Sequence, residues 1–235
     1  GGLLFSANIG SMTIKSDNSW KVKIHPGYIH DTSTPNQWYI PEWNVYYDAR
    51  NGAPMNNWTS DSYDDSFWSA AAEKGFPGDA PWGGLMDRTI PLHRFTDIMN
   101  YTNNASLPDK GNGSNIIATL PSNIHVTPYL HLDAPAGLKI TIQTDLYSGQ
   151  EGNPMRVTYI TSEGEQEFES LAWMSGQAVI YNIPKEVTIL GLGYRESGYN
   201  TEFAGSFTTN DPFYNQLWTE AGRTIYVNMR DTFMD

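Results

Sequence analysis

Short segments of this chain alternate between apolar and polar residues, and turn residues separate them. In the segment SWKVKIH, Trp20, Val22 and Ile24 fall on one side of an extended chain, while Lys21 and Lys23 fall on the other. This period of two is typical of half-buried β-strands. The 21 glycines and 14 prolines among the 235 residues supply frequent turns. The pattern therefore predicts an all-β fold.

The alternation is clearer in the second half of the chain. The segment IHVTPYLHL places Ile124, Val126, Leu130 and Leu132 on one face. Because the predicted strands are short and a turn follows every ~8–12 residues, an antiparallel β-sandwich is expected. The other strands predicted in this half are the segments LKITIQTDLY, MRVTYIT, QEFESLAWM, QAVIYNI, EVTILGLGYRES and TEFAGSFTT.

A polar segment divides the chain. Residues 100–114, NYTNNASLPDKGNGS, contain almost no apolar side chain, which is typical of a domain boundary. We therefore predict two antiparallel β-sandwich domains, residues 1–105 and 106–209. Residues 210–235 are expected to form a C-terminal linker helix.

The C-terminal helix has a recognisable start. Asp211 is suited to the N-cap, and Pro212 to the first helical position. Apolar side chains such as Phe213 and Leu217 then recur at helical spacing and form one stripe. Since Gly222 and a β-branched run weaken this helix, it is expected to need a packing partner.

Charge and composition exclude several classes of protein. The formal net charge of −12 argues against a nucleic-acid partner and against an anionic membrane surface. Without cysteine, the chain has neither disulfides nor thiolate chemistry. No apolar run approaches the ~20 residues of a membrane span, and GGLLFSANIG lacks the features of a signal peptide. Serine-hydrolase elbows, P-loops and His-Glu-x-x-His motifs are also missing from the sequence.

Two groups of residues are candidate metal ligands. His125 and His131 share one strand face, but six residues of strand separate them by ~20 Å, so a solvent-facing position is the better interpretation. Asp61, Asp64 and Asp65 could bind calcium, but their spacing matches no known loop. A capped turn leading into a short helical segment is therefore favoured. We expect no cofactor, with a structural calcium ion as the alternative.

Aromatic residues gather around one proline. Trp38, Tyr39, Trp43, Tyr46 and Tyr47 lie within ten residues of one another. Exposed rings stack well on sugars, and Trp38 and Trp43 are the candidates for such contact. The alternative is that these rings belong to the core, because β-sheets commonly bury aromatic side chains.

The C-terminal segment carries a resemblance. The triplet Gly193, Tyr194 and Arg195, followed by DPFYNQLW, resembles the region before the catalytic domain in α-L-rhamnosidase-like glycoside hydrolases of the family 78 type. In that family the triplet closes a β-sandwich, and a helix leads into an (α/α)6 barrel. The upstream segments resemble the family's second β domain and its N-terminal jelly-roll (galactose-binding-like) domain, here without the first strands.

The resemblance implies a function for the longer enzyme and a different one for this chain. Asp235 matches the aspartate that contacts rhamnose in the family, and the general acid would follow five residues later. The bacterial parent enzyme would hydrolyse terminal α-L-rhamnosides with inversion. This chain is expected to be an inactive portion that braces the missing C-terminal catalytic domain and contacts rhamnose-containing glycans. The implied location is periplasmic or extracellular.

Two further expectations follow. Phe213, Leu217, Trp218 and Ile225 should be partly exposed, since the resemblance implies that they pack on the missing domain. The alternative function is a stand-alone carbohydrate-binding, lectin-like module.

Overall fold

The chain divides into two compact units that interleave in sequence. The first unit consists of residues 1–26 and 54–89, and the second of residues 27–53 and 90–235. The computed structural model describes residues 2–29, 44–81, 83–146 and 156–230.

The first unit contains two small β-ladders. Strands β1 (Ser6–Ile9) and β2 (Met12–Lys15) form an antiparallel hairpin. Gly10 lies at its turn with φ of 60°, a conformation that favours glycine. Strand β3 (Lys21–Val22) pairs with β5 (Ser69–Ala70).

The helical segment predicted to end at Ala70–Ala72 is wrong. The backbone N–H of Ala71 donates to the carbonyl of Trp20 at 2.7 Å, so this stretch is extended. The turn before it forms as expected, because Asp64 Oδ1 accepts from the backbone N–H of Ser66 at 3.0 Å.

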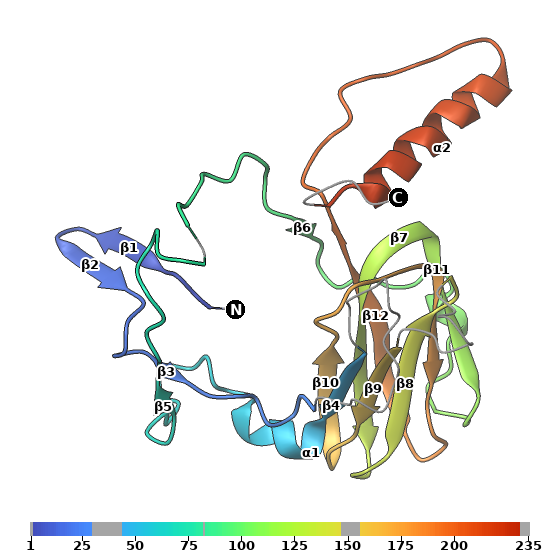
Figure 1. The fold of residues 1–235 in the computed structure, drawn as a ribbon. Coiled ribbons are helices and arrows are strands. Elements are labelled where there is room, and N and C mark those ends of the chain that lie inside the picture. The colour runs from blue at the N-terminus through green and yellow to red at the C-terminus, as the bar shows by residue number, and fades with distance from the viewer. Residues whose placement is uncertain (1, 30–43, 82, 147–155, 231–235) are drawn as a thin grey trace. The chain divides into compact units, whose positions relative to one another are not determined.

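The second unit is built on an eight-stranded sheet in the described residues, with the path β4-β9-β8-β11-β7-β12-β6 and with β10 paired to β7 (Figure 1). Apart from the parallel β4–β9 pair, neighbouring strands are antiparallel. The strands are β4 (Val45–Asp48), β6 (Arg94–Phe95), β7 (Asn115–Ala134), β8 (Lys139–Thr144), β9 (Arg156–Ile160), β10 (Gly164–Glu169), β11 (Met174–Asn182) and β12 (Thr188–Gly198). The helical elements are α1 (Ala49–Gly52), the 3₁₀ turns Ala53–Met55 and Asn104–Ser106, and α2 (Pro212–Asn228).

Strand β7 curls the sheet because its two halves have different neighbours. The half from Asn115 to Val126 pairs with β11. The half from Val126 to Asp133 pairs with β12, and β10 pairs with residues 129–134 on its other side. Figure 1 shows the strands wrapped around a common interior.

The interior of the curled sheet is apolar. The predicted inward face of β7 is confirmed: Ile124 is 6% exposed, and Val126, Leu130 and Leu132 are fully buried. The same cluster includes Ile140, Ile142, Val157, Tyr159, Phe168, Val179, Tyr181, Leu192 and Tyr194.

The polar segment 100–114 is attached to this sheet. Tyr101 is 2% exposed, and its hydroxyl lies 2.7 Å from that of Tyr181 and donates to the carbonyl of Gly193 at 2.9 Å. Asn103 donates to the carbonyl of Ile117 and accepts from the N–H of Thr119. The Asn103 amide thus extends the edge of β7, and together with the buried Tyr101 ring it anchors a segment that is otherwise polar.

Helix α2 begins as the sequence predicts. Asp211 is the N-cap, its side chain accepts from the N–H of Phe213 at 3.0 Å, and Pro212 opens the helix. The expected exposure is also confirmed, at 66% for Phe213, 51% for Leu217, 49% for Trp218 and 50% for Ile225.

The strand predicted at residues 201–209 is wrong. This stretch forms no ladder and instead packs beside α2. Phe207 lies 5.7 Å from Trp218 between ring centroids, and Phe203 lies 6.3 Å from Tyr226. Phe203 and Phe207 lie on the same side of the extended segment, and both contact side chains of α2. The segment therefore has the pattern of a strand because it packs on a helix.

The mainly β architecture is therefore confirmed, with few helices. The division into two sandwich domains at residues 1–105 and 106–209, and the linker role of residues 210–235, stay predictions. In the described residues, none of the helices has the length and apolar character needed to cross a membrane.

Candidate functional site

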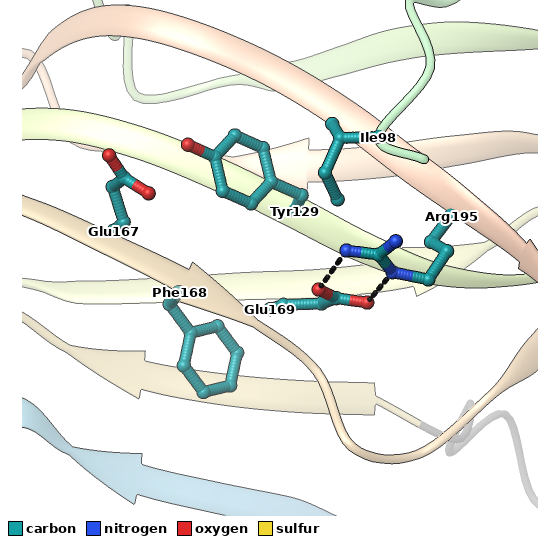
Figure 2. Close-up of a pocket in the computed structure, with 6 residues that line it drawn as sticks. All are labelled: Ile98, Tyr129, Glu167, Phe168, Glu169 and Arg195. Atoms are coloured by element: carbon teal, nitrogen blue, oxygen red, sulfur yellow. Dashed lines mark hydrogen bonds and ion pairs between the residues drawn. The ribbon is translucent and has the colours of Figure 1, made fainter. Parts of the chain in front are cut away.

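A shallow pocket lies on the outer face of the curled sheet. It has a volume of about 360 Å³ and is open to solvent. Figure 2 shows the lining side chains, which are Ile98, Tyr129, Glu167, Phe168, Glu169 and Arg195.

Strand β10 supplies the acidic side of the pocket. Its sequence alternates, so Glu165, Glu167 and Glu169 point outward while Phe168 is 6% exposed and joins the core. Among the described strands β10 pairs with β7 alone, and its outward carboxylates make the other edge unfavourable for pairing with another chain.

Strands β7 and β12 supply the remaining groups through their register. Tyr129 lies opposite Glu169 on one side and opposite Gly193 on the other. Arg195 lies opposite Thr127. Antiparallel pairing therefore brings residues from three separate segments to one surface.

Glu169 and Arg195 form a two-point ion pair (Figure 2). Arg195 Nε donates to Glu169 Oε1 at 2.8 Å, and Nη2 donates to Oε2 at 3.2 Å. The hydroxyl of Thr127 also donates to Oε1, at 2.8 Å, and Arg195 Nη1 donates to the carbonyl of Thr96. The pair is thus bonded on several sides, which fixes its geometry.

The electrostatics of Glu169 are those of a permanent anion. Burial alone would raise the pKa of Glu169, but hydrogen bonds from Arg195 and Thr127 outweigh it and hold the pKa below the usual value. A general acid in glycoside hydrolysis requires a raised pKa. Glu169 is therefore suited to positioning and to accepting hydrogen bonds.

Tyr129 remains a hydroxyl donor. Burial, followed by a hydrogen bond to Glu167 and the nearby negative charges, raises the pKa of Tyr129 to about 12. The phenol therefore stays protonated at physiological pH.

A second cluster, here called the α2 clasp, joins the end of α2 to the sheet. Its sheet residues are Asn123, His125, Trp173, Ser197 and Gly198, and its helix-end residues are Arg223, Tyr226, Val227 and Arg230. Figure 1 shows α2 at the end of the sheet near β7 and β12.

The contacts of the clasp are mainly polar. Arg223 donates to the carbonyl of Asn123 at 3.2 Å, and Arg230 donates to Ser197 Oγ at 3.2 Å. The guanidinium of Arg230 lies 4.3 Å from the ring centre of Trp173, a cation–π geometry. The sheet thus holds the last turns of α2 without covering the apolar stripe.

His125 is the buried centre of the clasp. It is 9% exposed, packs edge-on against Trp173 at 4.6 Å between centroids, and its Nε2 lies 2.5 Å from the carbonyl of Val227. Burial lowers the pKa of His125 to about 4, against the effect of the Val227 carbonyl and helped by Arg230 and His93. The predicted solvent-facing position is therefore wrong for His125, because α2 and Trp173 cover it.

The other sequence candidates have varied positions. Trp38, Trp43 and Asp235 lie outside the described residues. Tyr47 packs on Tyr159 with centroids 5.8 Å apart, as a core residue would. Asp65 binds the amine of Lys21 at 2.6 Å.

The contacts of His131 and the grouping of metal-ligating side chains both concern metal binding. His131, one of the two histidines of the sequence candidate, contacts a carboxylate: its Nε2 lies 2.7 Å from Glu165 Oε1. In the described part of the chain, no three metal-ligating side chains gather.

The pairing of Glu169 with Arg195 was not predicted from sequence. The signals available were the alternating glutamates at 165–169 and the triplet that contains Arg195. Neither signal gives the register of β10 and β12 against β7, which is what brings the two charges together.

Solved structures with a similar fold are α-L-rhamnosidases. An α-L-rhamnosidase from Dictyoglumus thermophilum aligns with 95% of this chain at a TM-score of 0.70 and 18% identity. An α-L-rhamnosidase from Aspergillus terreus aligns with 88% of the chain at a TM-score of 0.50 and 18% identity. The fold is α-L-rhamnosidase-like.

The match covers only part of those rhamnosidases. This chain spans 25% of the first and 23% of the second, so about a quarter of each. No family model matches the chain, and no curated protein matches it with significance. The expected resemblance is thus confirmed at the level of the fold.

Proposed function

We propose that this chain is a non-catalytic β portion of a bacterial α-L-rhamnosidase-like glycoside hydrolase. The observation that carries the proposal is the structural match over 95% of the chain at a TM-score of 0.70. The parent enzyme hydrolyses terminal α-L-rhamnosides with inversion, in the periplasm or outside the cell. The two sandwich domains and the linker helix of the sequence prediction belong to this proposal.

The chain itself is proposed to brace a C-terminal catalytic domain. Support comes from α2, whose apolar side chains Phe213, Leu217 and Ile225 are each at least half exposed. An apolar stripe on a helix is normally buried against a neighbouring element. In the intact enzyme Asp235 would contact rhamnose, while Trp38 and Trp43 would stack on glycan.

The experiment compares two proteins from the same gene with p-nitrophenyl α-L-rhamnopyranoside as substrate. One is residues 1–235, and the other continues into the downstream coding sequence. We expect nitrophenol release only from the longer protein. Release at enzyme-like rates by residues 1–235 would contradict the non-catalytic role. An inactive but folded longer protein would contradict the rhamnosidase assignment.

Bracing is tested in the longer protein by Leu217→Glu. A charge on the apolar stripe should lower the thermal stability of the catalytic domain, because burying an unpaired carboxylate is unfavourable. The matched control is Glu220→Gln, on an exposed part of the same helix. Equal stability of the two variants would argue against bracing through α2.

The alternative is a stand-alone carbohydrate-binding module. The open pocket beside Tyr129 is the observation that favours it. A gene that ends at residue 235, together with saturable sugar binding by the chain, would support this alternative over the first.

A further inference from the structure

The pocket beside Tyr129 has the arrangement of a small polyol site. Its volume of about 360 Å³ lies at the lower end of the range of ligand pockets. It has an apolar side and a charged side, and different residues form each.

Tyr129 and Ile98 form the apolar side. A Cβ added to Gly193 would lie 3.6 Å from Tyr129 Cδ1 and 2.9 Å from Ile98 Cγ2, so both side chains lie against this glycine. Because Gly193 has no side chain, the ring can lie over β12 at this position. A ring held in this way offers an apolar surface to a ligand.

Glu167 forms the free part of the charged side. Its side chain is 62% exposed, compared with 32% for Glu169. Arg195 and Thr127 occupy the Glu169 oxygens, whereas Glu167 lies 4.0 Å from His131 Nε2. An ionised carboxylate has about four acceptor positions, so Glu167 retains capacity for two ligand hydroxyls.

The charges define the class of ligand. Glu167, Glu169 and Arg195 together carry one net negative charge, within a chain of net charge −12. Anionic ligands such as uronates and phosphates are thereby disfavoured. A neutral ligand with adjacent hydroxyls and an apolar C–H face satisfies both sides of the pocket.

We propose that this pocket binds the ring of a neutral hexose or 6-deoxyhexose, with Glu167 accepting from two adjacent hydroxyls and Tyr129 contacting the C–H face. The choice of a sugar rests on the proposed function, whereas the residue roles rest on the pocket. Glu169 and Arg195 act as positioning residues, because their ion pair fixes the end of β10 beside the ligand.

The experiment is a calorimetric titration of residues 1–235 with L-rhamnose, D-galactose and D-glucuronate. We expect saturable binding of at least one neutral sugar and at least tenfold weaker binding of D-glucuronate. Glu167→Gln should weaken binding of the neutral sugar by about tenfold, since it removes the charge from the acceptor. The control Glu165→Gln, on the same face of the same strand, should bind as the unmodified chain does.

A second variant separates the ring from the carboxylate. Tyr129→Leu keeps apolar volume but removes the ring and hydroxyl, and should also weaken binding about tenfold. Its fold is checked by circular dichroism, and Glu167→Gln stands as the test if the leucine variant is unfolded. Absence of binding to both neutral sugars, or binding unchanged in Glu167→Gln, would overturn the proposal.

Failure of the site and failure of the proposed function give different results. A longer protein that hydrolyses the rhamnoside while residues 1–235 bind no sugar rejects only the pocket. Binding to D-galactose together with an inactive longer protein rejects only the rhamnosidase assignment.

Discussion

His125 illustrates how burial changes the chemistry of a residue that resembles a surface histidine in sequence. Its ring lies between Trp173 and the carbonyl of Val227, and Arg230 and His93 nearby both disfavour a positive charge on it. Nε2 carries a proton toward that carbonyl, and Nδ1 has no hydrogen-bond partner among the described residues. Protonation of Nδ1 would therefore add an unpaired charge to the clasp.

This arrangement predicts a pH dependence. The pKa of His125 is about 4 in the folded chain and 6.5 in a model peptide, so the unfolded chain binds more protons between these values. The stability that His125 contributes is complete above pH 6.5, falls as the pH decreases, and is lost below about pH 4. From pH 7 to pH 4.5 the loss is roughly 2–3 kcal/mol at most.

Urea unfolding at both pH values measures this loss. The comparison is with His125→Gln, which keeps a donor for Val227 and cannot become charged. We expect the variant to lose less stability on acidification. An identical pH dependence in both proteins would count against the buried neutral ring.

The Glu169–Arg195 ion pair makes a second prediction at this scale. Both side chains are about a third exposed or less, and four hydrogen bonds involve them. Glu169→Gln should lower the free energy of unfolding by about 1–2 kcal/mol, because Arg195 loses its charged partner in a half-buried position. The exposed control Glu165→Gln should change it by less than about 0.5 kcal/mol. Equal values in urea titrations would contradict the role assigned to the pair.

At the scale of elements, α2 is joined to the sheet mainly at its C-terminal end. Tyr226 lies directly against Gly198, where an added Cβ would overlap the tyrosine hydroxyl. Arg94 holds the same hydroxyl from the side, with Nε donating at 3.1 Å. The close approach of helix and strand therefore depends on a glycine at this position.

Gly198→Ala should loosen this junction. We expect faster hydrogen exchange in peptides that cover residues 213–228, because the new methyl group displaces Tyr226. The control is Gly191→Ala in the same strand, where the nearest atom, His131 Cβ, is at an ordinary distance of 3.8 Å. In Tyr226→Ala the glycine change should have little further effect, since the two residues act through one contact. If the effects of Gly198→Ala and Tyr226→Ala on hydrogen exchange add, the two residues do not act through a shared contact.

The elements differ in how well the sequence predicts them. Strands β7, β8, β9, β11 and β12 follow from their alternation, and α2 follows from Asp211 and Pro212. Residues 201–209 also alternate, but Phe203 and Phe207 contact α2, so periodicity reports one-sided packing and not the partner. Similarly, the buried position of His125 depends on a helix about 100 residues later, and the ion pair depends on strand register. Such contacts between distant segments are not encoded in local pattern.

At the scale of the whole molecule, the exposed apolar surface of α2 is the feature that most favours association. Phe213, Tyr214, Leu217 and Ile225 are each at least half exposed, close together on one helix. Phe213, Tyr214 and Leu217 lie in the N-terminal half of α2, away from the polar clasp at its C-terminal end. Ile225 lies at the clasp end but is half exposed there. Water contact with such a surface is unfavourable, so it favours association with another apolar surface.

In the isolated chain, this surface should cause self-association. We expect the sedimentation coefficient of residues 1–235 to rise with concentration, and Leu217→Glu to weaken that rise by placing a charge in the contact. The matched control is Leu171→Glu, since Leu171 is 76% exposed but lies in the turn after β10. If both glutamate variants reduce association equally, net charge and not the α2 surface is responsible. If neither does, the exposed stripe does not drive contacts between copies, and the bracing role proposed for it loses its main physical support.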